Sequence, residues 1–149
     1  MQRLLSLGGA LVLFASGCGK PIEPNPFDGV FVLRTVGGSH VPAVTHVAFA
    51  TEYWTLADTI VLRGDGSGEW KSRYSRHDLS TGLRDTTRTN SQFSYYLSDS
   101  MVRASDITCE PMCQRVPDER DFTVDGEWLT LGSGSSLHRY ERITSSVTR

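Results

Sequence analysis

Apolar and polar residues alternate with a period of two over most of the chain beyond residue 27, which is typical of half-buried β-strands. The clearest stretch is 54–63 (WTLADTIVLR), in which Leu56, Ile60 and Leu62 share one face and Asp58 interrupts it. No stretch outside the N-terminal segment shows the 3.6-residue period of an amphipathic helix. The pattern therefore predicts an all-β protein.

Turn residues divide this region into successive strands. Clusters of Gly, Asp, Ser and Pro punctuate the alternation, and Asp125-Gly126 is a strong two-residue hairpin signal. Residues 46–53 are ambiguous and could begin the strand that follows them. The predicted strands are 29–36, 54–63, 69–77, 84–97, 101–107, 120–124, 127–131 and 137–143, with a short edge piece at 41–43. Tight turns between them favour a single antiparallel up-and-down meander of about eight or nine strands.

A meander of this size must protect its two edge strands, and closure into a small barrel removes the edges. A small barrel has an interior that side chains fill or that holds one small ligand. The sequence leaves open which face of each strand points inward, because a slip of one residue exchanges the faces. We expect the barrel domain to span 28–144 and a C-terminal tail to follow at 145–149.

The first residues (MQRLLSLGGALVLFASGCGK) have the pattern of a secretory signal peptide. Arg3 supplies a positive charge, residues 4–14 are apolar, and the small residues at 15–17 suit a signal peptidase. The apolar stretch is shorter than the roughly 20 residues that a helix needs to cross a bilayer. We therefore expect a cleavable signal peptide at 1–17.

The residues Ala15-Ser16-Gly17-Cys18 resemble the bacterial lipobox. The resemblance implies that the Cys18 thiol receives a diacylglycerol, that the peptide before it is removed, and that the new amine is acylated, for example with palmitate. Each buried CH₂ group then contributes about 0.8 kcal/mol to membrane attachment, so several chains hold the protein firmly. Residues 18–27 contain three prolines and are expected to form a tether. Gly19 directly after the cysteine resembles lipoproteins of the outer membrane rather than the inner one.

The sequence contains three cysteines, and lipidation of Cys18 leaves Cys109 and Cys113 as a pair. An oxidising envelope allows them to form a disulfide within the segment Cys-Glu-Pro-Met-Cys. A metal site would require further Cys or His ligands nearby. A redox-active pair is more usually Cys-x-x-Cys at the start of a helix. A structural disulfide is the prediction, and the other two uses remain open.

The chain as a whole resembles the lipocalin-like β-barrel lipoproteins of bacterial envelopes over roughly residues 27–143. The signal, the Pro-rich tether and the segments GVFVLRTVGGSHVP, LADTIVLRGDGSGEW, FSYYLSDSMV and FTVDGEWLTL carry this resemblance. The turns Leu97-Ser98-Asp99-Ser100 and Val124-Asp125-Gly126-Glu127 match its turn motifs. Turn motifs imply a lipocalin-like barrel and assign no chemistry, and this family is mostly without assigned function.

Composition excludes several classes of function. The formal net charge is −2 and no long basic run is present, so nucleic acid is not an expected partner. The four histidines are scattered without the spacing of metal ligands, and no Gly-x-Ser-x-Gly motif is present. We therefore expect no metal, no cofactor and no enzymatic activity.

Aromatic residues on the predicted strands are the candidate ligand-binding residues, provided that one end of the barrel is open. They are Trp70, Tyr74, Phe93 and Tyr95, and Arg73, Arg76 or Arg88 near the mouth could meet an anionic group. The sequence favours an envelope lipoprotein that binds a small apolar or amphipathic molecule. The alternative is a structural or protein-interaction lipoprotein, such as an inhibitor, with a filled barrel and an envelope protein as its partner.

Overall fold

The computed structural model describes residues 27–110 and 119–143. Within these ranges it contains ten β-strands and a single short 3-10 helix, so the prediction of an all-β protein is confirmed. No helix of the described ranges has the length and hydrophobicity to cross a membrane. The elements are β1 (Gly29–Val36), β2 (Ser39–His40), β3 (Ala43–Ala48), β4 (Thr51–Leu62), β5 (Ser67–Asp78), β6 (Arg84–Ser98), β7 (Met101–Glu110), β8 (Glu119–Asp125), β9 (Trp128–Leu131), η1 (Gly134–Ser136) and β10 (His138–Ile143).

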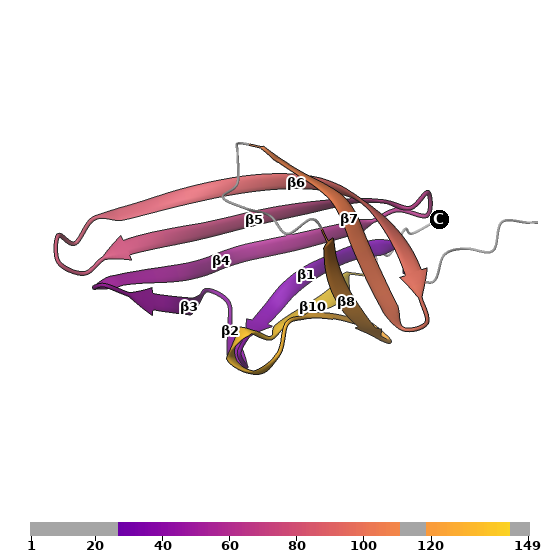
Figure 1. Cartoon of the computed structure of the whole chain (residues 1–149). Coiled ribbons are helices and arrows are strands. Elements are labelled where there is room, and N and C mark those ends of the chain that lie inside the picture. Colours follow the sequence, from indigo (N-terminus) through magenta and orange to yellow (C-terminus); the bar gives the residue numbers. More distant parts are fainter. Residues whose placement is uncertain (1–26, 111–118, 144–149) are drawn as a thin grey trace, which may run out of the picture.

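The strands form one antiparallel sheet that closes on itself (Figure 1). Hydrogen-bonded neighbours follow the order β2-β1-β10-β9-β8-β7-β6-β5-β4-β3, and β1 pairs in addition with β4. In that closing pair Gly29 lies opposite Leu62 and Phe31 opposite Ile60. The strands β1 and β4–β10 therefore make an eight-stranded barrel, which confirms the predicted meander and its closure.

The region before β4 differs from the predicted elements. The sequence predicts an edge piece at 41–43 and an ambiguous stretch at 46–53, whereas the structure has β3 and an earlier start of β4. The two strands are joined by a two-residue turn, Phe49-Ala50, in which φ is positive at both positions (48° and 59°). Turns of this kind usually carry Asn or Gly. Because neither is present, the sequence contains no turn signal here.

Two further boundaries lie outside the predicted ranges. β5 begins at Ser67, so Gly68 belongs to the strand and not to the turn. A Cβ atom on Gly68 would overlap the ring of Phe93, which lies opposite it in β6. The glycine is therefore required by close packing inside the barrel. β7 continues to Glu110, beyond the predicted end at 107.

β4, β5 and β6 are longer than the barrel requires and extend away from it (Figure 1). β1 pairs with β4 only from Thr59 onward, and β7 pairs with β6 only from Asn90 onward. Beyond those points the three strands pair with one another and with β3 alone. We call this part the projecting sheet, which comprises β3 and residues 51–55, 74–78 and 84–87.

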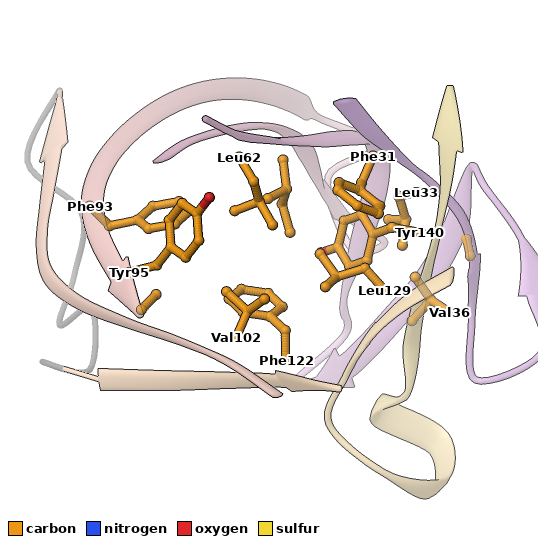
Figure 2. Packing of buried hydrophobic residues seen from close by; sticks show 13 residues of the cluster. Phe31, Leu33, Val36, Leu62, Phe93, Tyr95, Val102, Phe122, Leu129 and Tyr140 are labelled. Carbon is orange, nitrogen blue, oxygen red and sulfur yellow. The ribbon is translucent and has the colours of Figure 1, made fainter. Parts of the chain in front are cut away.

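A hydrophobic core fills much of the barrel, as Figure 2 shows. Every barrel strand except β5 contributes side chains to it, and several of these have no exposed surface at all. Burying one such side chain completely contributes about 1.5–3 kcal/mol. The core comprises Phe31, Leu33, Val36, Ala43, Ile60, Leu62, Phe93, Tyr95, Val102, Ala104, Phe122, Leu129 and Tyr140.

Candidate functional site

A polar cluster lies inside the barrel, where β4 and β5 leave it for the projecting sheet. Its centre is Asp58, which is buried and accepts hydrogen bonds on both carboxylate oxygens. The Tyr140 hydroxyl donates to Oδ2 at 2.9 Å, and the Ser72 hydroxyl donates to Oδ1 at 3.1 Å. The indole Nε1 of Trp70 also donates to Oδ1. The carboxyl group thus links β4, β5 and β10, since a buried polar group needs such partners.

Burial changes the ionisation of this group. It raises the pKa of Asp58 to about 6, although the hydrogen bonds from Tyr140, Trp70 and Ser72 act in the opposite direction. Burial also raises the pKa of Tyr140 well above its ordinary value, so the phenol keeps its proton and remains a donor. Asp58 is therefore the one member of this hydrogen-bonded group that titrates in a mildly acidic range.

Two basic side chains face the same interior. The guanidinium carbon of Arg120, on β8, lies 5.0 Å from the centroid of the Trp70 ring, a cation–π geometry. The ring of His138, on β10, lies edge-on to Tyr140 with 6.4 Å between centroids. Burial lowers the pKa of Arg120, and burial together with the Arg120 charge lowers the pKa of His138. We call the six residues the mouth cluster: Asp58, Trp70, Ser72, Arg120, His138 and Tyr140.

Nitrogen atoms of both basic residues are buried without a hydrogen-bond partner among the residues that the structure describes. These atoms are Nε of Arg120 and Nδ1 of His138. More than nine in ten buried polar groups in proteins are paired, because an unpaired one costs about 1–3 kcal/mol. Two nitrogens on one interior surface therefore lack the partners that buried polar groups usually have.

The mouth cluster is reached from solvent. Trp70, Ser72, Arg120, Leu131 and His138 are all partly exposed, although their side chains face the interior. The core residues further inside are fully covered. A side chain that faces a barrel interior contacts solvent only through an opening, so this end of the barrel is open at the cluster. The half-buried apolar residues Ile107 and Leu131 pack against the core.

The four aromatic residues that the sequence predicts to bind a ligand lie in different parts of the structure. Trp70 belongs to the mouth cluster. Phe93 and Tyr95 are buried in the core, where the Tyr95 hydroxyl donates to the carbonyl of Arg63 at 2.6 Å. Tyr74 shares the face of Trp70 but lies in the projecting sheet, and 40% of it is exposed. They do not form one pocket, because they occupy three different levels along the long strands.

Of the mouth cluster, the sequence nominates only Trp70. It misses Asp58, Ser72, Arg120, His138 and Tyr140. Asp58 carried a usable signal, since it interrupts the apolar face of an otherwise clear strand. Arg120 and His138 carried none, because a polar residue near the end of a strand is ordinary. Within the described ranges, no group of three or more His, Cys, Asp or Glu side chains is arranged to hold a metal ion.

The predicted lipidation and disulfide residues fall largely outside the described ranges. Cys18 and Cys113 lie outside them, and only the backbone of Cys109 is described, paired with Ser91. The part of the chain that the structure covers contains no disulfide. Because the predicted pair includes Cys113, the disulfide stays a prediction, as does the anchor at Cys18.

Comparisons with protein-family models, with curated proteins and with solved structures found no match to this chain. The function must therefore be inferred from the geometry of the molecule itself.

Proposed function

We propose that this chain is a lipid-anchored lipoprotein of a bacterial envelope and that it binds one small amphipathic molecule at the open end of its barrel. The observation that carries the ligand is the mouth cluster, with buried nitrogens of Arg120 and His138 that lack partners. Small-molecule sites combine an apolar wall with a few convergent polar groups, which is the composition found here. The anchor rests on the lipobox-like residues before Cys18. The resemblance to outer-membrane lipoproteins favours that membrane.

The chemistry of the cluster selects the polar end of the ligand. Arg120 donates from a fixed planar group, so a carboxylate or another acceptor oxygen suits it. The Asp58 carboxylate already accepts hydrogen bonds from three side chains, so it does not compete with the ligand for the donors of Arg120. The Trp70 ring, Ile107 and Leu131 then contact the apolar part. The packed core limits how far a ligand can enter the barrel, so the ligand occupies the mouth and does not reach the other end.

Native mass spectrometry tests this proposal. The full chain is expressed with its own signal, extracted from membranes in a mild detergent and examined for a co-purifying small molecule. Arg120→Met keeps apolar contact with Trp70 but removes the donor, and it should lower ligand occupancy at least tenfold. Arg139→Met is the matched control, because Arg139 stacks 4.4 Å from the Trp128 ring on the outer surface. Equal occupancy in both variants, or no adduct on the unchanged protein, would contradict the proposal.

The anchor has a separate test. Replacement of Cys18 by Ser removes the thiol that would carry the diacylglycerol. We expect the variant to leave the membrane fraction, as measured by fractionation and by the loss of the acyl mass. Membrane retention without acylation would overturn the lipoprotein assignment and leave the ligand site unaffected.

One observation favours the alternative, in which the protein binds an envelope protein. The far end of the projecting sheet exposes Phe49 fully and Leu79 and Leu83 by 50% and 71%. The two turns that carry them lie side by side, since the Leu79 amide donates to the Ala50 carbonyl at 2.8 Å. We call these three residues the apolar tip. Exposed apolar groups of this kind are typical of protein contacts.

Photocrosslinking in living cells separates the two functions. A photoreactive phenylalanine at position 49 should capture one envelope protein if the tip is a binding site. The same label at Tyr96, an exposed aromatic on the barrel, serves as the control. Capture at 49 alone supports the alternative, and equal capture at both positions excludes a specific tip contact.

A further inference from the structure

A second site lies on the outer face of the barrel wall, away from the mouth cluster. It is a hollow of about 580 Å³ across β4, β5 and β6. Ser72 points inward to Asp58, so its neighbours Lys71 and Arg73 point outward, because side chains alternate along a strand. We call this site the basic hollow. Its lining comprises Ala57, Thr59, Lys71, Ser72, Arg73, Arg88, Thr89 and Asn90.

The strand register places the basic residues of the hollow in two adjacent rows. Arg73 lies directly opposite Arg88 in the β5–β6 pair, and Ala57 lies opposite Arg73 on the other side. In the next row Lys71 lies between Thr59 and Asn90. Because the residues on β4 are small, open space remains beside the long basic side chains. Backbone pairing of three strands holds the whole arrangement in place.

The two arginine charges at this site are not balanced by the protein. Lys71, the third basic residue of the lining, and the neighbouring Arg63 lie 3.0 and 3.3 Å from the carboxylate of Glu69. Within the described residues neither Arg73 nor Arg88 takes part in an ion pair. Like charges directly opposite each other in a sheet are destabilising. An arrangement that is unfavourable by itself becomes favourable when an anion lies between the two guanidinium groups.

We propose that the basic hollow binds a phosphate group carried by a small molecule or by a lipid headgroup. Two planar guanidinium groups facing one space suit bidentate recognition of phosphate oxygens. Lys71, which is paired with Glu69, adds a further hydrogen-bond donor beside them. A group with two negative charges matches this set better than a single carboxylate does. Thr59 contributes a neutral hydrogen-bond donor at the rim, whereas the Asn90 side chain is hydrogen-bonded to Glu69. The basic side chains of this site lie on the other face of the sheet from Asp58 and Trp70 of the mouth cluster, and Ser72 is the one residue that borders both sites.

The test follows the arginine Nε–H signals of the full chain by NMR in micelles of a neutral detergent. Variants Arg73→Gln and Arg88→Gln assign the two signals by their loss. One arm adds inorganic pyrophosphate, and the other adds phosphatidylglycerol to the micelles. We expect the signals of Arg73 and Arg88 to shift saturably in at least one arm, and the arm identifies a soluble phosphate or a headgroup as the source.

A charge-matched control separates a site from general attraction. The pair Arg73→Gln/Arg88→Gln should weaken binding at least tenfold. The pair Arg76→Gln/Arg84→Gln makes the same charge change in the projecting sheet and should weaken it less than twofold. Equal weakening by both pairs would overturn the proposal, as would the absence of any shift in both arms. Without added anion, Arg88→Gln should raise the melting temperature slightly, because the like-charge pair is relieved.

Discussion

Each of the strands β4, β5 and β6 has one half in the barrel and one half in the projecting sheet. We call these the barrel half and the projecting half, and their environments differ. Inside the barrel Phe93 and Tyr95 are only 5% and 7% exposed, whereas Tyr53 and Tyr74 in the projecting sheet are 37% and 40% exposed. Residue type does not explain this contrast, because large aromatics occur in both halves. The barrel half faces other strands across a closed interior, and the projecting half faces none. Closure of the sheet therefore decides which aromatics become core.

The two halves of these strands have different roles. The barrel half carries the stability of the molecule and encloses the mouth cluster. The projecting half contributes little apolar burial and presents side chains to the surroundings, including the apolar tip. Substitutions in the first should change the free energy of unfolding strongly, and substitutions in the second should mainly change binding.

The largest difference is expected between two aromatic truncations. Phe122→Ala removes a fully buried ring and should lower the free energy of unfolding by about 3–5 kcal/mol. Tyr53→Ala removes a ring that is 37% exposed and should cost roughly 1 kcal/mol or less. Urea denaturation measures both values. Similar losses would mean that the projecting sheet is as much part of the core as the barrel is.

A pH titration tests the buried carboxyl group of the barrel half. The ordinary pKa of 3.8 applies to Asp58 in the unfolded chain, whereas the folded value is about 6. Between these values the folded protein holds a proton that the unfolded chain has lost. Stability should therefore fall by up to about 3 kcal/mol as the pH rises from about 4 to 6, and this contribution then levels off.

Asp58→Asn removes that contribution, so the difference in unfolding free energy between variant and unchanged protein should vary with pH over this window. Carboxyl groups with lowered pKa, such as Asp65 and Asp121, act in the opposite direction but cancel in the difference. Parallel pH profiles of the two proteins would show that Asp58 does not titrate in this range.

A smaller effect is expected from one added methyl group. Gly68→Ala places a Cβ atom against the ring of Phe93 inside the barrel and should cost about 1–3 kcal/mol. Gly82→Ala, in the turn of the projecting sheet, meets no neighbouring atom, and its cost comes only from the positive φ of 72°. The double variant Gly68→Ala/Phe93→Leu should recover part of the loss at position 68. No recovery would indicate that another contact determines this glycine.

The smallest effect has the opposite sign. Phe49 has a φ of 48°, which Asn tolerates far better than an aromatic residue does. Phe49→Asn should therefore stabilise the protein by up to about 1 kcal/mol in thermal denaturation. If the apolar tip binds a partner, the same variant loses that contact. A destabilised variant would show that the Phe49 side chain packs in the folded protein.

Period-two alternation and turn chemistry were sufficient to predict the strands of the barrel. Strands β6, β8, β9 and β10 lie close to their predicted positions, because each has one apolar face, whereas β7 runs to Glu110. The Phe49-Ala50 turn could not be predicted, since its backbone conformation is held by pairing and not by residue preference. The grouping of the mouth-cluster residues could not be predicted from the sequence either. Its members come from β4, β5, β8 and β10, and only the register of the closed sheet brings them together.

The amino-acid sequence by itself determined an antiparallel all-β meander, since alternation is a local property that short stretches of chain express. It also contains the signal-like segment and the cysteine that the anchor hypothesis requires. Only the tertiary structure decided which faces point inward, that three strands outgrow the barrel, and that Asp58, Arg120 and His138 share one interior. The physical reason is that these facts depend on pairing between residues far apart in the chain, as with Tyr140 and Asp58, which are 82 residues apart.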